Sequence, residues 1–297
     1  MTAGDFILKL LFLAQTGVGV AGNTLLLSVY APTSSTAHAP RPTHLILTHM
    51  AVANFLVLFF KGIPHTMLIW GITPILGNTG CRLVYYIHRV ARGLCLCTTC
   101  LLSNFQAITI SPRSARRMGL KDRAHKDVSF SCALCWILNL LINTFIPVHI
   151  EGLQHIHNST KIQSYGLCSS KSPRTTDAKL PIILTLPDVV FLVLMARASV
   201  FMVLLLYRHR QQVKHIRTQG NFHKVSPEAK ATQTILLLAS TFILFYSSNS
   251  ILTIYNVVVL KFYLWLQHTI SFLAACYPTL GPLILMLQDP QAPTCCS

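Results

Sequence analysis

The chain has 297 residues, of which 52% are apolar and 11% are charged, and its formal net charge is +16. Soluble domains carry roughly 25% charged residues, so this chain has too few charges to cover a water-exposed surface. The composition therefore argues against a soluble enzyme, a disordered tail or a coiled coil, and the arrangement of the apolar residues becomes the question.

Seven apolar segments follow one another along the chain. A helix needs roughly 20 apolar residues to cross a bilayer, and six segments contain uncharged runs of about that length. The other segment, the fifth, is apolar except for Asp188 and Arg197. The predicted spans cover about residues 8–30, 43–70, 81–110, 128–149, 180–207, 231–256 and 262–287. We predict an all-α membrane protein, a seven-transmembrane helix bundle that forms one domain over residues 1–297.

Basic loops set the predicted orientation of this bundle. The positive-inside rule places loops rich in Lys and Arg in the cytoplasm, and here it leaves the amino terminus extracellular. Much of the net charge is then a topology signal, and nucleic-acid binding is not needed to explain it. The basic residues after the third and fifth spans include Arg113, Arg116, Arg117, Arg208, Arg210 and Lys214.

Three further features fit this orientation. Asn158 begins the only N-glycosylation sequon, and it lies in the connection between spans four and five, which the charge rule places outside. Cys81, at the start of span three, and Cys168, in that same connection, would share the oxidising side and could form a disulfide. Cys295 and Cys296 follow the last span on the cytoplasmic side, where S-palmitoylation is chemically reasonable.

The spacing of cysteines and histidines does not favour a metal site or an enzyme. Cys95 and Cys97 would lie roughly 160° apart on a helix, so they cannot share an ion without unwinding it. No two histidines stand three or four residues apart, the spacing that brings two imidazoles onto one helical face. No Ser/His/Asp order or phosphate-binding glycine loop is visible either. We therefore predict no enzyme, no metal and no cofactor.

Charged residues inside the predicted spans are more informative. Arg89 and Arg92 share a helical face, roughly 12 Å and 16 Å below Cys81 at about 1.5 Å per residue. Asp188 is the only carboxylate inside a span in the outer half of the bundle. It cannot neutralise Arg197, because nine residues put the two on opposite sides of one helix. This excess of positive charge predicts a cavity suited to an uncharged or anionic small molecule rather than an amine. Arginines that extend to lipid headgroups or bond to carbonyl groups are the alternative.

Short strings of residues carry a family resemblance over nearly the whole chain. The third span contains HRVARG at 88–93, TTCLLS at 98–103 and FQAITISP at 105–112. Further strings are Ala53-Asn54, KGIP at 61–64, LCWILN at 134–139, YGLCSS at 165–170, SPE at 226–228 and ATQTIL at 231–236. Together they resemble the vomeronasal type-1 receptors, a family of pheromone receptors coupled to G proteins.

The resemblance implies a chemosensory receptor. A small molecule would bind among the outer halves of the helices, with His88, Arg89, Arg92 and Asp188 as candidate contacts. Binding would favour a state that activates an inhibitory-class heterotrimeric G protein, which the basic cytoplasmic residues would face. The resemblance also implies a multi-pass protein of the plasma membrane in chemosensory neurons, with the lipid bilayer, the ligand and the G protein as its partners.

Two other interpretations remain open at this point. A transporter or channel is one, although the chain shows no internal repeat and no acidic residue deep in the membrane. A decayed receptor that no longer signals is the other. Arg197 departs from the family pattern, which has an aromatic or apolar residue there, and we expect this charge to impair folding or trafficking.

The topology gives a first prediction. Residues 117 and 158 are expected on opposite sides of the membrane, because one predicted span lies between them. Epitopes placed at the two positions, probed in intact and permeabilised cells, measure this directly. Access to both from one side would contradict the seven-span topology, and loss of a glycan in Asn158→Gln gives an independent check.

Overall fold

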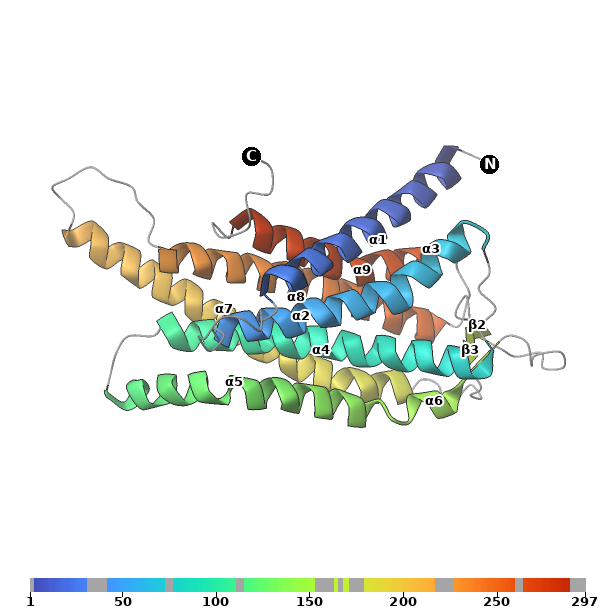
Figure 1. Cartoon of the computed structure of the whole chain (residues 1–297). Helices are drawn as coiled ribbons and strands as arrows, with labels where there is room; N and C mark the ends of the chain where they lie inside the picture. Colours follow the sequence, from blue (N-terminus) through green and yellow to red (C-terminus); the bar gives the residue numbers. More distant parts are fainter. Residues whose placement is uncertain are drawn as a thin grey trace.

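A computed structural model describes residues 3–30, 42–72, 77–110, 115–152, 163–164, 168–170, 179–216, 227–259 and 264–288. Seven of its helices are long and apolar enough to cross a membrane, which confirms the predicted helical bundle. The candidate spans are Gly4–Tyr30, Pro42–Ile69, Asn78–Ile110, Asp127–Val148, Pro187–Arg208, Thr232–Asn256 and Trp265–Leu287. Figure 1 shows these helices running side by side in one elongated bundle.

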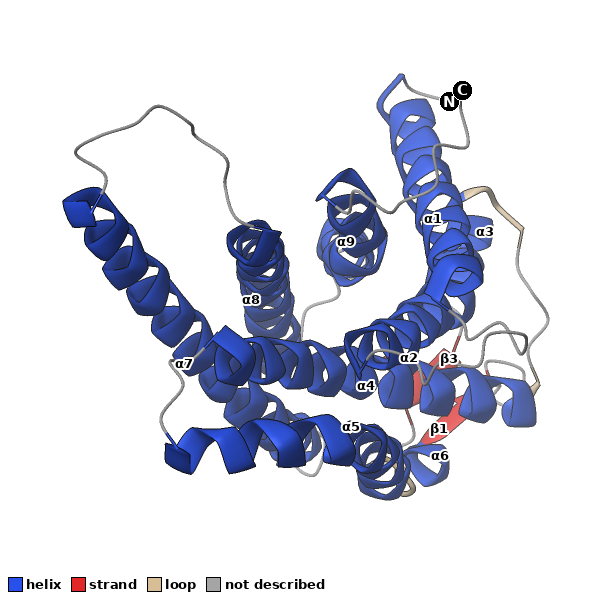
Figure 2. Ribbon diagram, turned by 60° about the vertical axis from the view of Figure 1, so that its left-hand side comes forward, coloured by secondary structure: helices blue, strands red, loops and turns tan. Residues whose placement is uncertain are grey.

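The bundle is organised around one helix. The long helices are α1 (Ala3–Tyr30), α2 (Pro42–Val57), α4 (Asn78–Ile110), α5 (Ala115–Ile142), α7 (Lys179–Ile216), α8 (Pro227–Val259) and α9 (Leu264–Gln288). Helix α4 packs against α2, α5, α7 and α8, and Figure 2 shows it between them. Its fully buried Leu94 and Leu96 belong to the same core cluster as Met195 of α7 and Leu238 of α8. Helix α4 therefore holds its side chains where several helices meet.

The second span is interrupted by a wider turn. A π-helical turn (Leu58–Gly62) joins α2 to the short helix α3 (Ile63–Ile69). Pro64 explains the interruption, because a proline ring would clash with the carbonyl of residue 60 in a regular helix. A π turn relieves such a clash and rotates the residues beside it. Helix α1 also packs closely here, since a Cβ atom at Gly19 would lie 2.6 Å from Leu58 Cδ1.

Helix α9 contains two prolines, and a side chain of α1 supplies a hydrogen bond that one of them removes. Pro282 has no N–H, so the carbonyl of Pro278, four residues earlier, loses its partner within the helix. The Asn23 amide donates to this carbonyl at 2.8 Å and to the Gly19 carbonyl at 2.7 Å. Asn23 is fully buried. Its side chain thus supplies the hydrogen bond that Pro282 cannot, as membrane interiors require.

A small antiparallel sheet lies at one end of the bundle, where the sequence predicted only a loop. Helix α6 (Ile146–His149) leads into β1 (Ile150–Gly152), and β1 contacts α4. The strands β2 (Gln163–Ser164) and β3 (Cys168–Ser170) complete the order β1-β3-β2. Figure 1 shows the sheet at the end where α1 begins, away from the end where α7 stops and α8 starts. The fold is therefore helical with one short sheet added.

The bond between α1 and α9 gives a second prediction. Replacing Asn23 by Ala leaves the Pro278 carbonyl without a partner inside the bundle, which costs about 1–3 kcal/mol. We expect a lower midpoint of thermal unfolding for the purified Asn23→Ala protein. Thr24→Ala is the matched control, because the exposed Thr24 hydroxyl bonds only to Val20 of its own helix. Equal midpoints for the two variants would contradict this role of Asn23.

Candidate ligand-binding site

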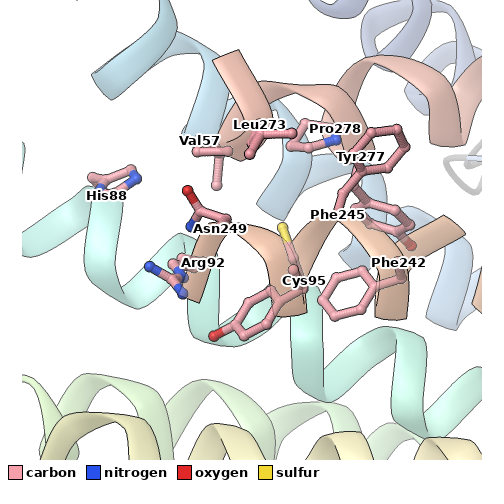
Figure 3. A pocket seen from close by; sticks show the side chains of 12 residues that line it. Val57, His88, Arg92, Cys95, Phe242, Phe245, Asn249, Leu273, Tyr277 and Pro278 are labelled. Carbon is pink, nitrogen blue, oxygen red and sulfur yellow. The ribbon is translucent and has the colours of Figure 1, made fainter. Parts of the chain in front are cut away.

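A cavity of about 400 Å³ lies between α2, α4, α8 and α9. One side of it is polar and the other is aromatic. Figure 3 shows His88, Arg92 and Asn249 together on one side, and Phe242, Phe245 and Tyr277 on the other. His88 and Arg92 lie nearer than Cys95 to the Cys81 end of α4, so the polar side is the one closer to the sheet. The cavity therefore suits a molecule with a polar group and an apolar body.

Two further cavities share walls with the first. One, of about 480 Å³, lies between α4, α5, α7 and α8 and shares Arg92 and Tyr246 with the first cavity. The other, of about 270 Å³, lies between α1, the π turn and α9 and shares Val57 and Ala274 with it. The side chains of Arg92 and Tyr246 thus stand between the first two cavities.

Polar atoms without hydrogen-bond partners gather around this space. Among the described side chains, five buried atoms that line the first two cavities have no partner. They are His88 Nε2, Arg89 Nε, Arg92 Nε, Tyr246 OH and Asn249 Oδ1. Buried polar groups are nearly always paired in folded proteins, because each unpaired one costs about 1–3 kcal/mol. A concentration of unpaired groups around a cavity indicates a site that binds a polar ligand.

The structure brings together the four residues that the sequence predicted for the cavity. His88, Arg89 and Arg92 project from α4, and Asp188 lines the second cavity beside both arginines. Asp188 lies close enough to Arg89 and Arg92 to interact electrostatically with each. The Arg92 guanidinium also donates to Ser250 Oγ at 3.1 Å. The arginines therefore face the bundle interior, not the lipid headgroups.

Lys61 is the cavity residue that the sequence analysis missed. It belongs to the π turn, lines the third cavity with His65, and interacts electrostatically with Arg89, Arg92 and His88. In the sequence, Lys61 appears as the charge that ends an uncharged run and as part of the KGIP string. The count of charges inside the spans could have included Lys61, but only the structure shows that it lies close enough to the arginines to interact with them.

A series of ring contacts leads away from Arg92 toward the centre of the bundle. The Arg92 guanidinium lies 4.6 Å from the centre of the Tyr246 ring, a cation–π contact. Tyr246 stacks on Phe242 at 5.1 Å, and Phe242 meets Tyr277 edge to face at 4.4 Å. The Tyr277 hydroxyl then shares a 2.7 Å hydrogen bond with Thr99. Three helices are thus linked through one line of packed side chains.

The cysteines divide into a bonded and a free group. Cys81 is fully buried and disulfide-bonded. The predicted partner, Cys168, lies in β3, whose neighbour β1 contacts α4, the helix that carries Cys81. Cys95, Cys97, Cys100, Cys132, Cys135 and Cys276 are free. Cys95 donates to Asn54, whereas Cys97 accepts from Asn139, so these two thiols make separate contacts on different helices.

The other predicted residues on described helices are basic and are not among those that line the three cavities. Arg116 and Arg117 belong to the first turn of α5, and Arg208, Arg210 and Lys214 belong to the far part of α7. Arg208 is exposed. Asn158, Arg113, Cys295 and Cys296 lie outside the described residues.

A seven-span bundle with a polar interior cavity is typical of seven-helix membrane receptors, and comparison with known proteins gives the family. The model of the vomeronasal organ pheromone receptor family matches residues 6–297. Human vomeronasal type-1 receptor 3 is 41% identical, covering 100% of this chain and 96% of the relative. Vomeronasal type-1 receptor 1 of the gorilla, Gorilla gorilla gorilla, is 41% identical, covering 94% of this chain and 79% of the relative. The zebrafish (Danio rerio) olfactory receptor class A-like protein 1 is 30% identical, over 93% and 87%.

The chain belongs to the vomeronasal organ pheromone receptor family, whose members include the vomeronasal type-1 receptors. It is therefore a multi-pass membrane protein and a chemosensory receptor, in a family of signalling receptors rather than enzymes. Membership of such a family implies a small-molecule ligand and coupling to a G protein.

The disulfide of Cys81 gives a third prediction. If Cys168 is its partner, Cys81→Ser, Cys168→Ser and the double variant should lose the same stability, about 2–5 kcal/mol, because each removes one bond. Surface expression and thermal unfolding measure the loss, and non-reducing peptide mapping identifies the linked cysteines. A double variant clearly less stable than either single variant would show that the two residues are not paired with each other.

Proposed function

We propose that this receptor binds a small pheromone-type molecule in the cavity between α2, α4, α8 and α9 and activates an inhibitory-class heterotrimeric G protein. The observation that carries the ligand site is the group of four residues with unpaired buried polar atoms that line it, with Arg89 in the adjoining second cavity. A ligand with a polar group would pair with these atoms, and its apolar part would lie against Phe242, Phe245 and Tyr277. The family of pheromone receptors supports the same class of ligand.

The charge of the site favours a ligand with an anionic group over an amine. Three cations, Lys61, Arg89 and Arg92, approach one another, and Asp188 is the only carboxylate among the residues that line the three cavities. Like charges at close range in a region of low dielectric repel strongly. An anion would relieve this repulsion, whereas an ammonium would add to it. The anionic group would then lie near Arg92, between Lys61 and His88.

The line of ring contacts offers a way for the ligand to act on the bundle. A ligand shifts a conformational equilibrium only by binding one state better than the other. An anion that pairs with Arg92 would compete with the cation–π contact to Tyr246, and Tyr246 packs on Phe242 and so on Tyr277. Displacing Tyr246 would change contacts on α8, α9 and α4 together. The state with Tyr246 displaced and the state with Tyr246 packed on Phe242 would then bind the ligand with different affinities.

The proposal also includes the orientation of the receptor in the membrane. The amino terminus, the sheet and Asn158 would lie outside, with the glycan at Asn158 and the disulfide between Cys81 and Cys168. The cytoplasmic face would hold the candidate G protein contacts Arg113, Arg116, Arg117, Arg208, Arg210 and Lys214, and palmitoylation at Cys295 or Cys296 would attach the carboxyl end to the membrane. The location would be the plasma membrane of chemosensory neurons. The pheromone receptor family model, which matches nearly the whole chain, supports a receptor of this kind.

Lys61 gives a fourth prediction, which tests the ligand chemistry. In Lys61→Met, the concentration of an aryl-alkyl carboxylate needed for half-maximal response should rise about tenfold to hundredfold, because a charged hydrogen bond is lost. The primary amide of the same compound should respond as before. The measurement is ligand-stimulated nucleotide exchange on an inhibitory-class G protein, with solute uptake followed in the same membranes to test for a transporter.

Lys9→Met is the matched control for this experiment. It also removes one lysine charge, but Lys9 lies over the Trp70 ring, 5.6 Å from its centre, and does not line the three cavities. Surface expression of both variants is measured alongside. An equal shift for carboxylate and amide would mean that Lys61 does not contact an anionic group.

A further inference from the structure

Arg197 is a cation for which the described part of the chain offers no partner. It lies in α7 with an exposed side chain, and it makes no hydrogen bond or ion pair with any described residue. The apolar residues around it on the same face are exposed as well. They are Val193, Leu194, Val200, Phe201 and Leu204. The arginine thus stands within an apolar surface that faces away from the bundle.

Arg197 lies too deep in its apolar segment for its side chain to reach the lipid phosphates of an unperturbed bilayer. The apolar segment of α7 covers about residues 180–207, so Arg197 lies at least about 15 Å from either end at 1.5 Å per residue. A fully extended arginine side chain reaches about 7 Å by standard bond lengths, which is too short for a lipid phosphate. An ionisable residue at this depth normally faces the bundle interior or pairs with an opposite charge. Arg197 therefore needs a carboxylate that comes from outside this bundle.

A second copy of the same chain cannot supply that carboxylate. Within the described spans the only acidic residues are Asp5, Asp127 and Asp188. Asp5 and Asp127 lie at the ends of apolar segments, and Asp188 lines the second cavity with Arg89 and Arg92, on the side of α7 opposite to Arg197. The spans of α2 to α4, α8 and α9 contain no Asp or Glu. The complementary charge must belong to a different polypeptide.

We infer that the outer face of α7 is a docking surface for a membrane-spanning helix of another protein, which carries an Asp or Glu near its midpoint. The carboxylate pairs with Arg197, and the helix packs against the apolar residues above and below it. Figure 2 shows α7 at the edge of the bundle, with α4 and α8 on its inner side. Hydrogen bonds between helices at this depth hold them together where lipid gives no hydrophobic drive.

The test uses the full-length receptor and a designed probe. The probe is a single-span helix of Leu and Ala with one Asp at its midpoint, and a second probe has Leu in place of Asp. Energy transfer between labelled receptor and probe in the same vesicles measures association. We expect the Asp probe to associate about three- to twentyfold more strongly than the Leu probe, the range typical of polar contacts between membrane helices.

Variants of the receptor assign this preference to one residue. Arg197→Leu should abolish the preference for the Asp probe, and Arg197→Lys should retain it. Arg208→Leu is the matched control, because Arg208 lies on nearly the same face of α7, eleven residues further along, at the end of the span. This variant should bind the Asp probe as the native receptor does.

Three results would overturn the inference. The native receptor could show no preference for the Asp probe. If Arg197→Trp also raised surface expression, the only effect of Arg197 would be to impair trafficking. The preference could persist in Arg197→Leu, which would assign it to another residue. Self-association of the receptor could depend on Arg197 when no probe is present, which would make a second copy the occupant.

Discussion

The need to pair every polar group inside a membrane governs this structure. Hydrocarbon offers no hydrogen bonds, so the chain crosses it as helices, whose backbone groups pair within each segment. Where a proline breaks that pairing, another side chain repairs it, as Asn23 does for the Pro278 carbonyl in α9. The exceptions are therefore informative. Most of the groups that stay unpaired in the described bundle belong to residues that line two adjoining cavities.

The shape of the first of these cavities relates recognition to the packing of the helices. Its polar side is formed by His88 and Arg92, about two and three turns after Cys81 on α4, with Asn249 of α8, and its other side by rings from α8 and α9. Arg92 takes part both in the cavity wall and in the contacts between rings, because it lines two cavities and also packs on Tyr246. A ligand cannot pair with this guanidinium without affecting the ring contacts that join three helices. Recognition and conformational change would then involve the same side chains.

Much of the fold could be predicted from the sequence, because the thickness of a bilayer fixes the length of an apolar helix. The spacing of Arg89 and Arg92 predicted that both lie on one face of the helix, and the structure places both at the interior cavities. Lys61 could not be positioned in this way, because the π turn before Pro64 alters which face a residue occupies. Strands of two or three residues, such as β2, carry no periodic signal. Contacts such as Phe242 with Tyr277 depend on which helices become neighbours, which local patterns do not specify.

The cations inside the spans show two consequences of the need to pair polar groups within a membrane. Lys61, Arg89 and Arg92 lie close enough to repel one another, so the unliganded bundle would carry an electrostatic cost that an anion bound among them would lower. Part of the affinity for an anion would then come from relief of this repulsion, and binding would stabilise the folded receptor by linkage. Arg197 stands on the side of α7 opposite to Asp188, which lines the cavity, so a ligand bound there cannot compensate its charge. On these proposals, the inner cations would make the receptor respond to a small molecule, and the outer one would bind a neighbour in the membrane.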